Sequence, residues 1–268
     1  MRLSANLSLL FTELPLIQRP QAAAAMGFDG VEIQFPYELP ALQLQESLAR
    51  AGMPLVLINL PAADLMQGGA GLAAVPSRRE AFRLALEEAL AYAAVVRPAC
   101  VNVLAGRLPD GISRAEALHT LVDNLRLAAQ AFDALGIQVL CEAINPLDMP
   151  GFLINTPQQL DELLRQVGHP NCLAQLDLYH LARQELDAAA GIDLLKGRIG
   201  HVQFADCPGR GAPGTARVDF FIALKALAAA GYIGWFGAEY NAPTLRLEDC
   251  RWLASWRSAW ENLQVEAR

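Results

Sequence analysis

Residues Ile137–Glu142, IQVLCE, form an apolar run that ends on a carboxylate. Three later runs repeat this pattern and end on Asp177, Gln203 and Glu239 (CLAQLD, residues 172–177; IGHVQ, 199–203; GWFGAE, 234–239). The four polar ends lie 35, 26 and 36 positions apart, close to the length of one strand–helix–strand unit, about 30 residues or more. The spacing therefore predicts parallel strands whose carboxyl ends carry these polar side chains.

The rest of the chain shows the same alternation of strand-like and helix-like runs. Amphipathic segments such as Arg78–Val96 place apolar residues at helical spacing between the strands. The expected strands are residues 3–9, 31–35, 54–60, 99–105, 138–144, 173–178, 199–205 and 235–240. The expected helix starts are Ser77, Ser113 and Thr156-Pro157, and the expected helix ends are Gly27, Gly52, Gly136 and Gly231.

Eight strand–helix units, with a last helix at residues 245–263, favour a closed (β/α)₈ TIM barrel formed by a single domain, residues 1–268. An open doubly wound sheet is the main alternative, but no GxGxxG motif follows the first strand. The stripe of Trp252, Trp256 and Trp260 is expected to pack against the barrel.

Composition narrows the class of partner. The net charge of −7 and a pI near 5.1 argue against nucleic acid or an anionic membrane as partner. The five cysteines show no CxxC spacing, which indicates small buried thiols and a reducing cytoplasm. The amino terminus shows no signal-peptide pattern, and no apolar run reaches the roughly 20 residues that span a bilayer. The oligomeric state stays open, a homo-oligomer included.

The polar strand ends predict a metal site. In a closed barrel they converge on one cavity, where three carboxylates and an amide would repel one another unless a cation lay among them. We expect Glu142, Asp177, Gln203 and Glu239 to bind a divalent metal ion. The alternative is that each is a strand-end polar group that meets solvent or an arginine. The residues two positions earlier share the inward face and are mostly uncharged: Leu140, Gln175, His201 and Gly237.

Three further polar residues lie near the expected cavity. His180 follows Asp177 by three positions, just past the strand end, and is expected to contact the substrate. Arg210 lies in the Gly/Pro-rich segment 207–214, which could close as a lid and place this guanidinium on a substrate carboxylate. His201 lies deeper on the same strand as Gln203, and we expect it to be a hydrogen-bonded core residue.

The sequence resembles the hydroxypyruvate isomerase family, which is part of the xylose-isomerase-like barrels. The matching motifs are SANLS (4–8), GFDGVE (27–32), NLPA (59–62), CEAIN (141–145), DMPGF (148–152), QLDLYH (175–180), GHVQ (200–203) and GAEY (237–240). The resemblance implies a metal, Mg²⁺ or Mn²⁺, held by Glu142, Asp177, Gln203 and Glu239, with the two glutamates as the acid/base pair. It also implies that His180 and Arg210 reach the substrate.

Some residues depart from the family pattern. The family commonly has His in place of Ile58 and Pro146, and acidic residues in place of Ala212 and Arg217. We expect these positions to form the rim of the cavity, and we expect their change to affect the choice of substrate more than the reaction class. The alternatives are a 2-oxo-tetronate isomerase, a ketose 3-epimerase and a non-catalytic metabolite-binding barrel.

The expected reaction is an aldose–ketose type isomerisation of a small hydroxy-keto acid. Hydroxypyruvate would give tartronate semialdehyde through an enediolate, whose charge a divalent ion stabilises. Glu142 and Glu239 would exchange the proton as base and acid.

Overall fold

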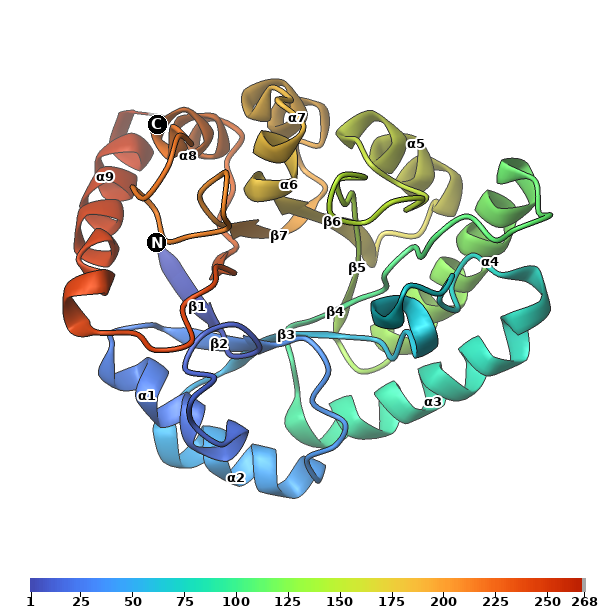
Figure 1. Cartoon of the computed structure of the whole chain (residues 1–268), viewed down its shortest axis with the longest axis horizontal. Helices are drawn as coiled ribbons and strands as arrows, with labels where there is room; N and C mark the ends of the chain where they lie inside the picture. The colour runs from blue at the N-terminus through green and yellow to red at the C-terminus, as the bar shows by residue number, and fades with distance from the viewer. Residues whose placement is uncertain (267–268) are drawn as a thin grey trace.

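The computed structural model describes residues 1–266, which form a closed barrel of eight parallel strands surrounded by helices (Figure 1). This confirms the predicted TIM barrel. The strands are β1 (Arg2–Asn6), β2 (Gly30–Ile33), β3 (Leu55–Asn59), β4 (Cys100–Asn102), β5 (Gln138–Glu142), β6 (Cys172–Asp177), β7 (Ile199–Phe204) and β8 (Trp235–Ala238). Each strand pairs with the next along the chain, and β1 pairs with β8 to close the barrel.

The α-helices within residues 1–266 number nine: α1 (Arg19–Ala25), α2 (Ala41–Ala51), α3 (Arg79–Val96), α4 (Arg114–Asp133), α5 (Pro157–Val167), α6 (Leu178–Arg183), α7 (Ala188–Leu194), α8 (Phe220–Ala229) and α9 (Trp252–Glu266). Four short 3₁₀ helices accompany them: η1 (Leu16–Gln18), η2 (Ala63–Gln67), η3 (Pro76–Arg78) and η4 (Leu247–Cys250). One helix more than expected arises between β6 and β7. Glu185 adopts a left-handed conformation (φ 56°) after α6, and Asp187 then caps α7 through the amides of Ala189 and Ala190.

The predicted helix signals differ in outcome. Ser113 caps α4 in a capping box with Glu116, and Thr156 caps α5 ahead of Pro157. The predicted cap at Ser77 is wrong, because Ser77 lies inside η3 and no side chain of the described residues caps α3 at Arg79. The chain enters the 3₁₀ turn of η3 before α3 begins. In this turn the backbone amide of Arg78 donates to the Val75 carbonyl at 2.9 Å.

The core lies between the barrel and its helices. The three predicted tryptophans of α9 are buried there, with ring centroids 4.6 Å apart between Trp256 and Phe204 and 4.9 Å apart between Trp260 and Phe236. All five cysteines fall within residues 1–266, and they are buried and free. None of the helices in these residues is both long and apolar enough to cross a membrane.

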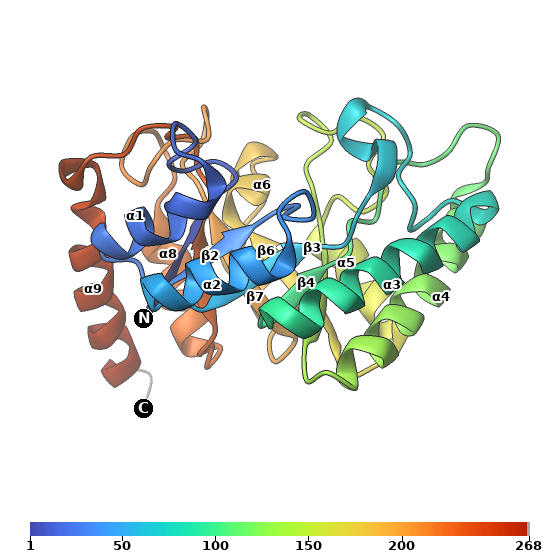
Figure 2. The ribbon, with the colours of Figure 1, turned by 90° about the horizontal axis from the view of Figure 1, so that it is seen from below.

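The loops that follow the strands gather at one end of the barrel (Figure 2). The strands are shorter at this end than predicted. The chain turns away after Asn6, for example, because the amides of Leu9 and Leu10 both bond to the Asn6 carbonyl, at 3.1 and 2.9 Å. The polar residues at the strand ends therefore border a space that the loops enclose.

Candidate active site

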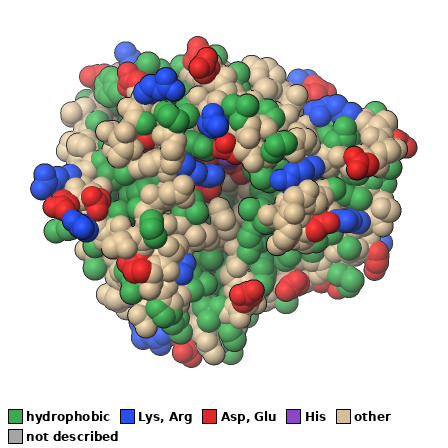
Figure 3. All heavy atoms as spheres, viewed as in Figure 1, with side chains coloured by type: hydrophobic (Ala, Val, Ile, Leu, Met, Phe, Trp, Pro, Cys, Tyr) green, Lys and Arg blue, Asp and Glu red, His purple; other side chains and the backbone are tan. Residues whose placement is uncertain are grey.

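A cavity of about 220 Å³ opens at the carboxyl ends of the strands. The face of the molecule at this end is hollowed near its centre (Figure 3). Five of the six predicted site residues line the cavity, namely Glu142, His180, Gln203, Arg210 and Glu239. Asp177, the sixth, is buried at the end of β6 beside them. The structure thus brings together all six residues that the sequence singled out.

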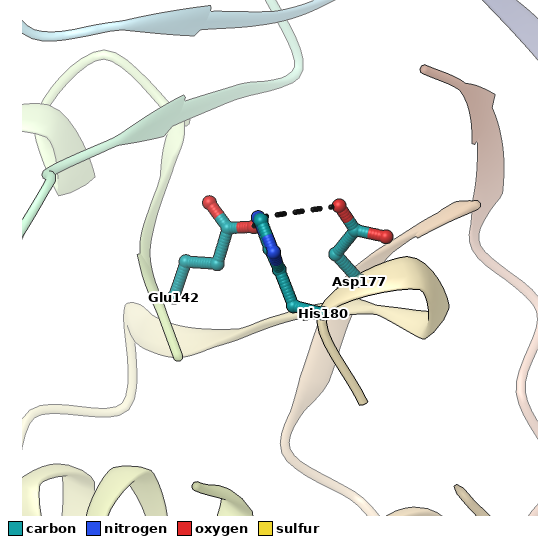
Figure 4. A group of neighbouring side chains, drawn as sticks. All are labelled: Glu142, Asp177 and His180. Carbon is teal, nitrogen blue, oxygen red and sulfur yellow. Dashed lines mark ion pairs between the residues drawn. The ribbon is translucent and has the colours of Figure 1, made fainter. Parts of the chain in front are cut away.

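Glu142, Asp177 and His180 form the tightest group. One donor atom from each residue lies within 4.8 Å of the others. His180 Nε2 lies 3.6 Å from Glu142 Oε1 and 3.6 Å from Asp177 Oδ2, and the ring extends between the two carboxylates (Figure 4). The first residues of α6 follow directly after β6, so Asp177 and His180 lie on adjoining elements. His180 belongs to the cavity wall rather than to its outer rim.

Glu239 lies just after β8 and receives donors from distant parts of the chain. Asn6 Nδ2 and Gln34 Nε2 each lie 3.2 Å from its carboxylate. Arg210 forms an ion pair with the same carboxylate, and its Nη2 lies 3.7 Å from Asp177 Oδ2. The Arg210 guanidinium also lies 4.9 Å from the centre of the Tyr179 ring. Arg210 is therefore held inside the cavity beside the carboxylates.

Gln203 is held from two sides. Its Nε2 donates to Glu32 Oε2 at 2.7 Å, and its Oε1 accepts from Gln175 Nε2 at 2.5 Å. The same Gln175 nitrogen donates to Glu142 Oε2 at 3.0 Å. Gln175 Nε2 therefore holds the Gln203 and Glu142 side chains in place at the cavity wall.

The layer beneath the site differs from the prediction. Glu32 is fully buried there, and its Oε1 lies 2.5 Å from Ser4 Oγ and 2.8 Å from His201 Nε2. We expected a mostly uncharged layer, and the buried carboxylate of Glu32 was not predicted. Closure of the barrel brings Glu32 on β2 against residues of β7, which are distant in the sequence. The expectation that His201 is a hydrogen-bonded core residue is confirmed. The signal for Glu32 was present, since Glu32 and Gln34 are two apart on one strand and share its inward face.

Gly237 provides the space for the Glu32 carboxylate. A Cβ atom at this position would lie 2.0 Å from Glu32 Oε1, which is far shorter than any real contact. A side chain at position 237 would therefore displace the carboxylate that orients Gln203.

Burial controls the charge state of the carboxylates. Burial raises the pKa of Glu142 well above its ordinary value, and the neighbouring charges of Asp177 and Glu239 raise it further. Burial raises the pKa of Glu239 to about 8, although the Arg210 charge acts in the opposite direction. Asp177 Oδ2 is buried and has no hydrogen-bond partner among the described residues. A cation among these oxygens would relieve the cost of each buried charge.

A second network supports His180 through its Nδ1 atom. His180 Nδ1 lies 2.7 Å from Asn145 Nδ2, and Asn145 also bonds to Asp148. Asp148 accepts from Tyr179 Oη at 2.7 Å and from Arg183 Nε at 3.2 Å. Asn145 and Asp148 lie in the motifs CEAIN (141–145) and DMPGF (148–152), but the sequence alone did not predict a role for either residue.

The loop after β7 is already folded over the cavity. Asp206 is fully buried and accepts the amides of Cys207, Gly214, Ala216 and Val218, at 2.8–3.0 Å. This carboxylate organises residues 207–218, and it holds the segment from which Arg210 enters the cavity. Arg210 itself adopts a left-handed conformation (φ 53°).

The four positions that depart from the family pattern are not part of the cavity wall as residues 1–266 define it. Ile58 is fully buried in the core between barrel and helices, so its expected place at the rim is wrong. Strand alternation directs it outward, while Asn59 lines the cavity. Pro146 and Arg217 are exposed, and Ala212 is half-buried in the outer part of the loop.

Comparison with known proteins shows the family of the chain. The model of the family "Xylose isomerase-like TIM barrel" matches residues 20–256. The hydroxypyruvate isomerase of Escherichia coli (strain K12) is 38% identical and covers 96% of this chain and 100% of its own length. The 2-oxo-tetronate isomerase of Pectobacterium atrosepticum is 36% identical over 95% of this chain and 97% of its own.

A solved structure has the same fold throughout. The crystal structure described as AP endonuclease, family 2, from Brucella melitensis superposes with a TM-score of 0.90 at 34% identity. The match covers 95% of this chain and 98% of that one.

Proposed function

The chain belongs to the xylose isomerase-like TIM barrel family, in the group with hydroxypyruvate isomerase and 2-oxo-tetronate isomerase, and from this membership we propose that it isomerises a small hydroxy-keto acid. The observation that carries the proposal is a pair of buried glutamates, Glu142 on β5 and Glu239 after β8, facing one cavity. Hydroxypyruvate is the proposed substrate and tartronate semialdehyde the product.

A divalent ion, Mg²⁺ or Mn²⁺, is the proposed cofactor. The donors are Glu142, Asp177, Gln203 and Glu239, a mostly anionic oxygen set of the kind these ions prefer. Support comes from Asp177 Oδ2, which is buried without a hydrogen-bond partner among the described residues, and from the burial of both glutamates. When bound, such an ion supplies positive charge that stabilises an enediolate.

The reaction moves one proton between adjacent carbons. In hydroxypyruvate the proton leaves C3 and returns to C2, while the C3 hydroxyl proton moves to the C2 oxygen. Glu142 and Glu239 are the proposed base and acid, because both carboxylates border the cavity that would hold the substrate. His180 would donate a hydrogen bond to a substrate oxygen, and Arg210 would bind the substrate carboxylate.

The cavity favours a short substrate. Its volume is about 220 Å³, and its lining includes the apolar side chains of Met66, Leu104 and Met149. These groups offer no hydrogen bonds to the additional hydroxyls of a hexose, which disfavours a ketose 3-epimerase. A four-carbon 2-oxo-tetronate remains the second candidate. Cleavage of nucleic acid is disfavoured by the net charge of −7. The five free cysteines suit a reducing compartment such as the cytoplasm.

The decisive test replaces each glutamate by its amide. Glu142→Gln and Glu239→Gln keep the size of the side chain but remove the proton acceptor, so turnover of hydroxypyruvate should fall by about a hundredfold or more. The assay follows loss of deuterium from the C3-labelled substrate to solvent, with circular dichroism as the check on folding. Glu46→Gln, on the exposed face of α2, is the matched control.

Two outcomes would reject the proposal. One is a folded Glu142→Gln or Glu239→Gln variant that keeps a third of wild-type turnover. The other is full activity after thorough treatment with EDTA, which would exclude the metal ion. Label retained in the substrate by the wild-type protein with every ion would favour a non-catalytic binding barrel.

A further inference from the structure

Asn145 is fully buried in the turn after β5, where its side chain connects His180 to Asp148. Its amide nitrogen lies 2.7 Å from His180 Nδ1 and 3.1 Å from Asp148 Oδ2. Its amide oxygen accepts the backbone N–H of Asp148 at 2.8 Å. Every polar atom of this side chain therefore has a partner inside the protein.

The neighbours of Asn145 allow its amide one orientation. A backbone N–H can only donate, so the atom facing the amide of Asp148 must be the oxygen. Burial alone would raise the pKa of Asp148, but hydrogen bonds from Tyr179 and Asn145 and the Arg183 charge outweigh it and leave this pKa lowered. Asp148 is thus an ionised acceptor, and the atom facing it must be the amide nitrogen. Both contacts assign the same orientation independently.

This orientation decides which nitrogen of His180 carries the proton. The Asn145 nitrogen has no lone pair to offer, so it donates to His180 Nδ1, which must be unprotonated. The ring is then neutral, with its proton on Nε2. That N–H points between Glu142 and Asp177, 3.6 Å from an oxygen of each.

We propose that Asn145 is a positioning residue that fixes His180 as the Nε2–H tautomer, so that His180 donates to a substrate oxygen and is excluded from binding the metal ion. The position of His180 alone would allow the other role, because its Nε2 lies with Glu142 and Asp177 in a group compact enough to hold an ion. A protonated nitrogen has no free electron pair for an ion, so the tautomer separates the two roles. The substrate contact rests on the proposed function, whereas the tautomer follows from the hydrogen bonds alone.

The test reads the tautomer directly. The chain has four histidines, so a two-bond ¹H–¹⁵N spectrum of protein labelled at the imidazole nitrogens resolves every ring, and His180→Gln assigns the signals of His180. In the Mg²⁺-loaded wild-type protein, we expect His180 to carry its proton on Nε2 alone. The tautomer is read in the wild-type protein, and His180→Gln serves only to assign the signals. A proton on Nδ1 would overturn the proposal.

Asn145→Asp should invert the tautomer. An aspartate oxygen in place of the amide nitrogen accepts from Nδ1–H, which leaves a free electron pair on Nε2 facing Glu142 and Asp177. The His180 proton should move to Nδ1, and the absorption bands of bound Co²⁺ should shift as a nitrogen ligand enters. The proposal fails if Asn145→Asp leaves Nδ1 of His180 without a proton. The signals of His201, which bonds to Glu32, serve as the internal control and should not change.

Activity separates this proposal from the proposed function. If the wild-type protein isomerises hydroxypyruvate, Asn145→Asp should lower kcat by about 10–100-fold, and Asn145→Asp with unchanged kcat would overturn the role in positioning. If the wild-type protein shows the Nε2–H tautomer without isomerase activity, the proposed function fails while the assignment of the tautomer stands.

Discussion

At the scale of the residue, Arg210 has two opposing effects on the site. Its charge stabilises the buried carboxylates of Glu239 and Asp177 and so makes ionised forms less costly. The same charge repels a divalent ion from those oxygens, and the ion must replace the Arg210 contacts when it binds. A substrate carboxylate would offer the guanidinium a new partner. If the proposed ion and acid bind here, Arg210 would couple the binding of one to the binding of the other.

Arg210→Met should change the two affinities in opposite directions. Removal of the cation should strengthen Mg²⁺ binding by about tenfold, roughly 1.4 kcal/mol, while KM for hydroxypyruvate rises by about tenfold or more. Calorimetric titration of metal-free protein measures the first change, and initial rates measure the second. Arg50→Met on the exposed side of α2 is the control for loss of charge. Weaker Mg²⁺ binding by Arg210→Met would contradict this account.

Sequence reasoning found residues whose type and spacing point to the same chemistry. Glu142, Asp177, Gln203 and Glu239 could be predicted as a group because each ends a strand. Asn145 could not be assigned a role, because its contacts depend on how the turn after β5 meets α6. Glu32 was missed for a related reason, since its partner His201 lies 169 positions away.

At the scale of the element, the loop after β7 owes its shape to one carboxylate. Asp206 accepts four backbone amides, which hold the loop in the conformation that brings Arg210 to the cavity. The sequence indicated a lid from its glycines and prolines, but glycine content says nothing of where a loop rests. The loop conformation that Asp206 stabilises places Arg210 in contact with Glu239.

Asp206→Asn should loosen this loop while the barrel remains intact. An amide has one acceptor oxygen where the carboxylate has two, so about half of the four amide bonds should be lost. Hydrogen exchange should increase in residues 207–218, and KM should rise by about tenfold because Arg210 is less well placed. Asp187→Asn, which weakens the cap of α7, is the control and should leave KM unchanged. Unaltered exchange in residues 207–218 would show that the loop is held by other contacts.

Element prediction succeeded where local chemistry is sufficient. All eight strands were placed, and so were the caps at Ser113 and Thr156. The errors lie at boundaries that depend on neighbours. The break between α6 and α7 rests on the left-handed Glu185, a conformation that the residue type does not suggest.

At the scale of the whole molecule, closure of the barrel concentrates negative charge. β5 and β8 are three strands apart, yet the closed sheet makes Glu142 and Glu239 face one cavity. The ordinary pKa of Glu239 is 4.5, and burial raises it to about 8 in the folded protein. At this residue, folded protein therefore binds more protons than unfolded protein between these values, so the contribution of Glu239 to stability is greatest at low pH and is lost as pH rises through about 8. Glu142 shifts in the same direction.

Metal-free protein should lose thermal stability between pH 6.5 and 8. The window begins at 6.5 because burial lowers the pKa of His180 from that value, which acts in the opposite sense at lower pH. Mg²⁺ should raise the Tm more at pH 8 than at pH 6.5, since the ion binds ionised carboxylates and releases roughly one to two protons. Scanning calorimetry with and without EDTA measures both effects.

The control for this pH dependence is the double variant Glu142→Gln/Glu239→Gln. It cannot titrate at these positions, so its Tm in EDTA should vary less between pH 6.5 and 8 than that of the wild-type protein. A metal-free wild-type protein that gains stability over this range would show that the two glutamates are not the protonated groups.

The close approach of Gly237 to Glu32 limits how the pocket can be redesigned. A Cβ atom at position 237 would lie 2.0 Å from Glu32 Oε1, so no larger residue fits there. Glycine also has no side chain that could be shortened to enlarge the cavity. Room for a longer carbon chain has to come from elsewhere in the lining, where trimming Met66 or Met149 would enlarge the space and leave the proposed proton-transfer groups untouched. Chain-length preference and chemistry are therefore separable in this scaffold.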